Sequence, residues 1–594
     1  MKHRGLQFLL PYMRPYYGLL LLGTFYAFIG AGASAFSPTL LGWGIDALIH
    51  GITARTLALY ALGLIGLAIT VAIFRYWLRM LTGQIAAGVT YRMSQDLFQR
   101  LLLFDQETRQ HYGTGDLLSR ATSDFIYIWR FYSAGYQMSI HSLFLLLIGC
   151  ALMAITSPLL AGLVMGMLIV SIVAQVRLGG VLEASFDRVQ QEMAKISAFA
   201  QEHLSAGRML IAYAQEPAVG IAFRQANQEY VEQNIHFVLQ SGLISPLPSL
   251  MVRIAATVIV LMGGLMIIGK QLTIGEYVQF IVYLGLLNNG AQQITGAFER
   301  LQQGSAAAGR IGEVLHRWPK ISDGPDAIDP AVDGHIRFEQ VGVWAKDQER
   351  WVVRNIDLDI PAGTTVGIVG PTGAGKSMLI SLLGRIHDPD EGKVTLDGHD
   401  LRHLQLATLR RNVVYVPQET LLFSMPLREN IALGLANTSE EQLHHAMSQA
   451  RLVNDLPQLP KGLDSPVGER GVTLSGGQKQ RTALARALVR DPKVLLLDDA
   501  LASVDMQTSA EIMAELRPVA GGKGPRRTCI VVSQRMAAVQ EADQIIVLDH
   551  GQIVECGNHA ALMALGGRYA EMVQREIEQA AEEIPDSKIM RSIG

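Results

Sequence analysis

Long apolar runs fill the first half of the chain, whereas the second half alternates short apolar runs with polar stretches. A run of about 20 apolar residues is long enough to cross a bilayer as a helix. Six such runs lie at roughly 17–45, 57–81, 138–157, 159–180, 246–268 and 276–297. The pattern predicts a transmembrane domain within residues 1–318, with six spans in a lipid bilayer.

The first apolar run raises the question of a cleaved signal peptide. It follows a basic start and contains "ASA" at 33–35, which resembles a signal-peptidase site. The run continues past this point to "LLGWGI" and is therefore longer than the apolar core of a signal peptide. We predict an uncleaved first span.

Basic residues gather in two of the connections between spans. The connections between spans two and three and between spans four and five carry Arg92, Arg100, Arg109, Arg120 and Arg130, and Arg177, Arg188, Lys195, Arg208 and Arg224. Connections on the cytoplasmic side of a membrane are enriched in Lys and Arg. We therefore expect a multi-pass protein of the inner (cytoplasmic) membrane with both termini and the long connections in the cytoplasm. Apolar residues at three- and four-residue spacing, as in "SQDLFQRLLLF", predict that the spans continue as helices beyond the bilayer.

Three arginines lie within the predicted spans, and they leave two interpretations open. Arg75 and Arg79 lie toward the cytoplasmic end of span two, and Arg253 lies near the cytoplasmic start of span five. Such side chains commonly reach the interface or pair with a neighbour. Alternatively, Arg75 and Arg253 line a cavity that opens to the inner leaflet and contact an anionic head group.

The second half reads as a soluble α/β domain. A Pro-, Gly- and Asp-rich stretch at 319–334 is typical of a linker. A domain at 335–575 and a charged tail at 576–594 follow it. In "TTVGIVGPTGAGKSMLISLLGRI" (364–386), a strand, a glycine-rich loop and a helix are predicted in the order that a P-loop requires.

The P-loop predicts binding of a nucleoside triphosphate with Mg²⁺. The motif G-x-x-x-x-G-K-[ST] runs through Gly370, Pro371, Thr372, Gly373, Ala374, Gly375, Lys376 and Ser377. Its backbone N–H groups and the helix N-terminus attract phosphate. In such loops the lysine reaches the β- and γ-phosphates and the Ser hydroxyl ligates Mg²⁺. Mg²⁺ and a nucleotide that carries β- and γ-phosphates, such as ATP, are therefore the expected cofactors.

Three further segments fit the same site. The apolar strand "VLLLD" (494–498) ends in Asp498, placed to help hold Mg²⁺. Gln418 ends the strand of "VVYVPQETLLF", where its amide can reach the metal and the attacking water. "LSGGQKQR" opens a helix and forms a second anion site. Its candidate binding residues are Leu474, Ser475, Gly476, Gly477 and Gln478.

With these motifs together, the chain resembles the ATP-binding cassette (ABC) exporters over almost its whole length. The resemblance rests on "GPTGAGKS", "VPQE", "GERGVTLSGGQKQR", "LLLDDALASVD" and "GQIVECGNHAAL". It implies an all-α six-helix transmembrane domain fused to a soluble α/β P-loop NTPase domain, an ATP-hydrolysing transporter. It also implies a domain-swapped dimer in which each ATP lies between one chain's P-loop and the other chain's "LSGGQ". Residues 113–124 and 202–216 resemble the two coupling segments, with Tyr213 as the docking aromatic.

Three positions depart from the family pattern. The family's catalytic glutamate is replaced by Asp499, whose side chain is one methylene shorter. The family's histidine is replaced by Gln534, which carries no charge at any pH. The adenine-stacking aromatic is expected near Ala345, so the neighbouring Trp344 is the candidate, although strand alternation points it to the opposite face.

The departures spare nucleotide binding and alter the water-activating and γ-phosphate-sensing groups. The chain thus resembles the degenerate-site subunit of a heterodimeric exporter of drugs, lipids or peptides, which lends an intact signature to a partner half-transporter. The alternatives are a homodimeric lipid or drug flippase with slow hydrolysis and a nucleotide-gated regulatory membrane subunit. An importer and a leader-peptide peptidase are not expected. The net charge of −3 gives no sign of a nucleic-acid partner. The three cysteines lack metal spacing.

Overall fold

The structure, a computed structural model, describes residues 4–346, 348–435, 437–468, 471–516 and 527–582. Residues 583–594 of the predicted tail therefore lie outside the described residues, as do Glu469 and Arg470 ahead of "LSGGQ". The chain divides into two compact units. The membrane unit comprises residues 1–103 and 112–318, and the soluble unit comprises residues 104–111 and 319–594.

Helices, most of them long, build the membrane unit. They are α1 (Arg4–Met13), α2 (Tyr17–Ile49), α3 (Ala54–Leu103), α5 (Thr114–Arg130), α6 (Tyr136–Thr156), α7 (Pro158–Ser205), α8 (Gly207–Ala212), α9 (Glu216–Ile244), α10 (Leu247–Ile268) and α11 (Ile274–His316). At a rise of about 1.5 Å per residue, the 50 residues of α3 span about 75 Å. This is more than twice the thickness of a bilayer core, so the predicted helical extensions beyond the spans are confirmed.

Five helical stretches of the described chain are long and apolar enough to cross a membrane: Gln7–Ile49, Ala54–Leu103, Thr114–Thr156, Pro158–Ser205 and Glu216–Ile268. They contain the first five predicted spans to within a residue. The sixth, 276–297, lies in α11, whose polar residues make it less apolar. Gln279 faces the bundle there, because its amide donates to Thr39 Oγ1 (3.3 Å) and Thr156 Oγ1 (3.2 Å). The assignment of 276–297 as a sixth span stays a prediction.

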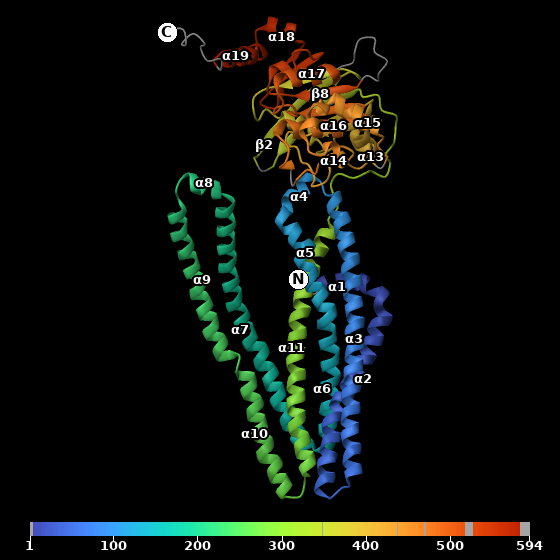
Figure 1. Cartoon of the computed structure of the whole chain (residues 1–594), viewed down its shortest axis with the longest axis vertical. Coiled ribbons are helices and arrows are strands. Elements are labelled where there is room, and N and C mark those ends of the chain that lie inside the picture. Colours follow the sequence, from blue (N-terminus) through green and yellow to red (C-terminus); the bar gives the residue numbers. More distant parts are fainter. Residues whose placement is uncertain (1–3, 347, 436, 469–470, 517–526, 583–594) are drawn as a thin grey trace. The chain divides into compact units, whose positions relative to one another are not determined.

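The helices of the membrane unit form a bundle, and α7 and α10 pack against its helices α6 and α11. α2, α3, α6 and α11 pack against one another, whereas α9 packs along α7 and α8 joins their ends. Figure 1 shows this pair as two neighbouring green helices with α8 at their tip. None of the described residues of α9 is buried. Tyr213, directly after α8, is 72% exposed.

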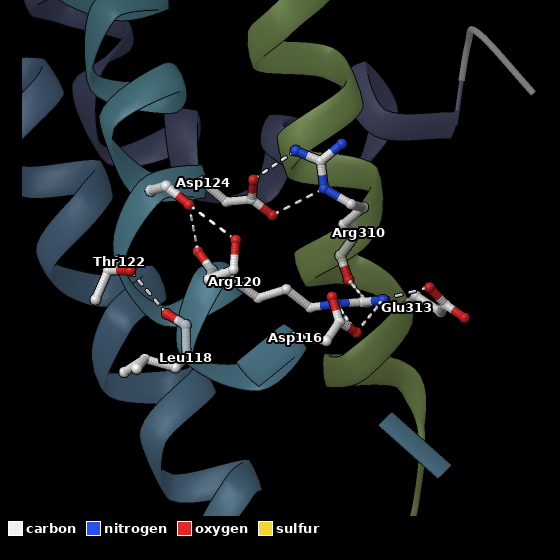
Figure 2. A network of polar contacts seen from close by, with 9 residues as sticks. Asp116, Leu118, Arg120, Thr122, Asp124, Arg310 and Glu313 are labelled. Carbon is white, nitrogen blue, oxygen red and sulfur yellow. Dashed lines mark hydrogen bonds and ion pairs between the residues drawn. The ribbon is translucent and has the colours of Figure 1, made fainter. Parts of the chain in front are cut away.

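Ion pairs join α5 to α11 within the bundle. Arg310 donates to both carboxylate oxygens of Asp124, at 3.0 and 2.5 Å. Arg120 pairs with Asp116 (2.9 Å) and Glu313 (3.1 Å) and also donates to the carbonyl of Arg310 (2.7 Å). Figure 2 shows these contacts crossing between the two helices. Arg120 and Asp124 are buried.

Two sheets form the soluble unit. A four-stranded sheet has the order β2-β1-β4-β5 and a six-stranded sheet has the order β10-β9-β3-β8-β7-β6. The strands are β1 (Ile336–Ala345), β2 (Arg350–Ile360), β3 (Thr365–Val369), β4 (Glu391–Leu396), β5 (His399–Asp400), β6 (Val413–Val416), β7 (Val494–Asp498), β8 (Thr528–Val532), β9 (Gln544–Asp549) and β10 (Gln552–Gly557). The strands β9, β3, β8, β7 and β6 are parallel, and every residue of β3, β7 and β8 is buried.

Helices accompany these sheets. They are α12 (Lys376–Leu383), α13 (Leu406–Asn412), α14 (Leu427–Ile431), α15 (Glu440–Gln449), α16 (Gly476–Leu488), α17 (Met506–Leu516), α18 (His559–Leu565) and α19 (Arg568–Glu582). Parallel strands buried on both faces read as continuous apolar runs, which is why "VLLLD" was recognisable as β7.

The short helix α4 (Gln106–Tyr112) begins in the part of the chain that groups with the soluble unit. Asp105 accepts from the backbone N–H of Lys320 (2.7 Å), and Glu107 pairs with the Lys320 ammonium (2.6 Å). The stretch predicted as the first coupling segment, 113–124, lies almost entirely in α5 of the membrane unit. Residues 104–111 are thus part of the soluble unit, and the coupling role of 113–124 stays a prediction. The predicted linker also lies on this unit, where Ile328 donates to His403 (2.8 Å).

Candidate functional site

Two glycines shape the P-loop between β3 and α12. Gly370 and Gly375 have φ values of 146° and 97°, which residues with a side chain rarely adopt. A Cβ on Gly370 would lie 2.0 Å from the carbonyl oxygen of Leu548, and one on Gly375 would lie 2.7 Å from that of Val352. Both positions therefore require glycine. The predicted strand, loop and helix are confirmed, with α12 starting at Lys376.

Lys376 lies in the P-loop with its ammonium close to the backbone. Its Nζ donates to the carbonyls of Gly370 (2.7 Å) and Pro371 (2.9 Å). Burial lowers the pKa of Lys376, and the nearby carboxylates Asp499 and Asp498 oppose that shift. The lysine and both aspartates, far apart in sequence, thus lie in one electrostatic neighbourhood.

Asp498 ends β7 and is held from two sides. Ser377 Oγ donates to its Oδ1 (3.0 Å), and the Tyr415 hydroxyl donates to its Oδ2 (2.8 Å). Tyr415 comes from β6, the parallel neighbour of β7. Burial, together with the hydrogen bond to Asp498, raises the pKa of Tyr415 well above its usual value, so the phenol remains a donor. The motif-based reading missed Tyr415, because only the register of β6 against β7 brings it to Asp498.

Asp499 follows the strand in a left-handed conformation, with φ 48°. Asp tolerates this region better than most residues. Its backbone N–H donates to the carbonyl of Val532 (2.9 Å), and its Oδ2 accepts from the amide of Gln418 (3.3 Å). The structure therefore brings together Gln418 and Asp499, both predicted as candidate catalytic residues.

Gln534 lies just after β8, which is paired on its two sides with β3 and β7. The carboxyl ends of these parallel strands also carry the P-loop and Asp498. Gln534 is exposed. The next residue, Arg535, donates to the carbonyls of Ala502 (2.7 Å) and Val504 (2.9 Å). The loop that bears Gln534 is thereby tied to the loop that follows Asp499.

The signature segment opens α16 as predicted. Ser475 is its N-cap: Ser475 Oγ accepts from Gln478 N (3.3 Å), and Gln478 Oε1 accepts from Ser475 N (3.0 Å). This reciprocal pair is a capping box. A Cβ on Gly476 or Gly477 would lie 3.3 or 3.1 Å from Ser503, so the loop after Asp499 packs closely over this helix start.

Trp344 lies near the end of β1, where the register is irregular. The alternation of side chains along β1 therefore does not decide on which face of the sheet Trp344 lies. Its ring meets Trp351 edge to face, with centroids 5.3 Å apart, and its backbone N–H donates to Asp390 Oδ2 (2.8 Å). Stacking of Trp344 on adenine stays a prediction.

The residues around Asp498 suit Mg²⁺, which prefers oxygen ligands. Ser377 and Asp498 supply a hydroxyl and a carboxylate within hydrogen-bonding distance of each other. Gln418 supplies an amide oxygen and is linked to this cluster through Asp499. The donor set therefore fits a magnesium ion beside the P-loop.

Comparison with known proteins agrees with this geometry. The "ABC transporter" family matches residues 353–502, and the "ABC transporter transmembrane region" family matches residues 20–290. The multidrug resistance-like ATP-binding protein MdlA of Escherichia coli is 30% identical over 93% of this chain and 93% of its own length. The ATP-dependent lipid A-core flippase of Chromohalobacter salexigens is 29% identical over 96% of this chain and 98% of its own length.

A solved structure has the same fold. A bacterial Atm1-family ABC exporter with ATP bound superposes with a TM-score of 0.81 at 24% identity, covering 95% of this chain and 98% of that one. The predicted fold class, a helical membrane domain fused to a nucleotide-binding domain, is confirmed. The chain belongs to the ABC transporters, as an ATP-hydrolysing exporter with both domains fused in one polypeptide.

Proposed function

We propose that the chain is one half of a heterodimeric exporter and that its own P-loop site is the weaker of two ATP sites. One observation carries the proposal. Of the groups expected to bind phosphate and metal, Ser377 is hydrogen-bonded to Asp498, and Lys376 lies within electrostatic reach of Asp498. The two groups expected to activate water and sense the γ-phosphate are instead Asp499 and Gln534.

Geometry supports a slow site. The Asp499 carboxylate is one methylene shorter than the family's glutamate, and a displacement of about 1 Å in a catalytic group costs on the order of 10²-fold in rate. Its Oδ2 accepts a hydrogen bond from Gln418. Gln534 cannot become a cation, so it cannot stabilise developing charge as an imidazolium does. Mg²⁺ held by Ser377, Asp498 and Gln418 would neutralise phosphate charge.

The capped helix start at Ser475 supports a role in a second site. Its backbone N–H groups and small glycines suit a phosphate presented by another chain. We propose a domain-swapped dimer in which Leu474–Gln478 complete the partner's ATP site. The exposed α8 tip and the α9 face without buried residues are consistent with a chain that packs on a second half-transporter.

The relatives' names indicate only a broad class of substrate. One relative is named for multidrug resistance and another for flipping lipid A-core. We propose amphipathic cargo (a drug, lipid or peptide) moved from the cytoplasm or inner leaflet. We further propose that the protein lies in the inner membrane, with the nucleotide-binding domain in the cytoplasm.

The test compares hydrolysis by the lone chain with hydrolysis by the complex. The purified chain, alone and co-expressed with a half-transporter that carries Glu and His at the two altered positions, is assayed for ATP hydrolysis. We expect the lone chain to be slower by about 10²-fold. The double variant Asp499→Glu/Gln534→His should speed up the lone chain, and Lys376→Ala should abolish nucleotide binding. Brisk hydrolysis by the unmodified lone chain would instead support the homodimeric flippase.

A further inference from the structure

A cavity of about 230 Å³ lies inside the helix bundle of the membrane unit. Four helices line it: α2, α3, α6 and α11. Its polar residues are Arg75, Gln137, His141 and Gln293, and two aromatic rings, Tyr26 and Phe74, stand beside them. Of the two arginines for which a cavity was considered from the sequence, Arg75 lines this one, and Arg253 on α10 is not among its lining residues.

The charge in this cavity lacks a balancing carboxylate. Among the described residues that line it, none is Asp or Glu, and no ion pair joins Arg75 to a carboxylate anywhere in the described chain. The helix that carries Arg75 is apolar enough to span a membrane. A cation within a membrane span is costly unless it meets a partner or lines a water-filled pathway.

A hydrogen bond orients one of the other polar groups. Gln293 Oε1 accepts from Ser142 Oγ (3.4 Å), which leaves the Gln293 NH₂ group to donate. His141 lies one helical turn after Gln137 on α6 and also lines the cavity. The Tyr26 and Phe74 rings meet edge to face, with centroids 5.5 Å apart. The cavity therefore combines fixed donors, one permanent cation and an aromatic wall.

We propose that this cavity binds the anionic group, a carboxylate or a phosphate, of an acidic amphiphile. A guanidinium presents paired N–H donors that match both anions, and the amide of Gln293 adds a further donor. The volume is smaller than that of pockets for whole drug-sized ligands, so it holds the head of the molecule while the apolar body extends outward. The inference rests on the proposed transport of amphipathic cargo and narrows that cargo to acidic compounds.

The test measures anion binding by the purified, nucleotide-free full chain. One arm uses native mass spectrometry with dioleoyl phosphatidic acid against dioleoyl phosphatidylcholine. The other uses equilibrium dialysis with 2-naphthoate against 2-naphthamide. We expect the anion to bind more tightly than its neutral counterpart in at least one arm. Preference in the lipid arm alone identifies a head group, and preference in the naphthoate arm alone identifies a soluble acid.

Variants of the arginine decide whether the cavity is responsible. Arg75→Gln should weaken anion binding roughly 10- to 100-fold, as expected for loss of a charged hydrogen bond, and Arg75→Lys should weaken it less. Arg79→Gln, one helical turn away and outside the cavity lining, is the matched control and should bind as the unmodified chain does. Binding of a fluorescent ATP analogue verifies that each variant is folded.

Two results would overturn the site: equal affinity for anionic and neutral probes, or equal effects of Arg75→Gln and Arg79→Gln. The assay needs neither a partner chain nor hydrolysis. Arg75-dependent binding without transport by the complex would therefore count against the proposed transport of amphipathic cargo and leave the anion site standing.

Discussion

At the scale of single residues, Tyr415 is the group at the nucleotide site that the motifs did not reveal. It donates to Asp498 Oδ2 at 2.8 Å, while Ser377 donates to Oδ1. Partners of metal-binding carboxylates orient them, and losing one typically lowers metal affinity about tenfold or more. We predict that Tyr415→Phe raises the Mg²⁺ concentration needed for half-maximal binding of a fluorescent ATP analogue by about tenfold.

A second tyrosine serves as the control for this prediction. Tyr569 is buried in the same unit, and its hydroxyl is hydrogen-bonded to His559 (2.8 Å). Tyr569→Phe removes an equivalent hydroxyl away from Asp498, so the Mg²⁺ dependence should not change. An unchanged Mg²⁺ requirement in Tyr415→Phe would mean that the phenol only fills space beside β7.

Two further residues distinguish the chain's own ATP site from the one that it completes. In the assembled complex, we predict that Ser475→Ala nearly abolishes ATP hydrolysis, because the signature serves the competent site. Asp499→Asn should cost little, because it changes the weak site. Steady-state hydrolysis of the purified complex measures both. A large loss in Asp499→Asn with indifference to Ser475→Ala would reverse the assignment of the two sites.

Loss of a helix cap must be separated from loss of the signature. Ser475→Ala removes an N-cap, which costs about 1 kcal/mol of stability by itself. Ser439 caps α15 with the same kind of capping box, paired with Gln442. Ser439→Ala should therefore lower stability by a similar amount while the complex keeps its ATP hydrolysis.

At the scale of elements, the ion pairs between α5 and α11 fix two helices that are distant in sequence (Figure 2). The carboxylate of Asp124 is 4% exposed and its partner Arg310 is 46% exposed. We predict that Asp124→Asn destabilises the membrane unit by about 1–2 kcal/mol, less than for a fully buried pair because water can solvate Arg310. A thermal unfolding midpoint lowered by a few degrees would report this loss.

Asp116 offers the matched control on the same helix. It is 43% exposed, and Arg120 keeps Glu313 and the Arg310 carbonyl when Asp116 is neutralised. Asp116→Asn should therefore shift the midpoint less than Asp124→Asn does. Equal shifts would show that burial of Asp124 adds nothing to the pairing.

The ion pairs between α5 and α11 also show what could not be predicted from the sequence. The apolar runs predicted the first five spans and their helical extensions, and motif spacing placed the P-loop, β7 and the start of α16. Arg120 counted in the sequence only as a positive charge, because its partner Glu313 lies 193 residues away and no local pattern links them. Tyr415 was missed for the same reason. Trp344 stayed open because the irregular register of β1 breaks the alternation on which the argument relied.

At the scale of the whole molecule, the α7–α9 pair ends in apolar residues that the described helices of the membrane unit leave exposed. Met209, Ile211 and Tyr213 at this tip are 55%, 69% and 72% exposed. Apolar residues gathered at an exposed tip favour contact with another protein surface. In the proposed dimer this surface is the soluble unit of the second chain, and the tip would transmit closure around ATP to the membrane helices.

We predict that Ile211→Asp leaves the lone chain as stable as before, because the side chain is already exposed, and uncouples the assembled complex. A buried unpaired charge at the contact would weaken docking by several-fold or more. Vesicle transport should fall while binding of an ATP analogue persists. Gln225→Asp, which adds the same charge on an exposed position of α9, is the control and should leave transport unchanged. Transport at the unmodified rate by the Ile211→Asp complex would show that the tip stays in solvent.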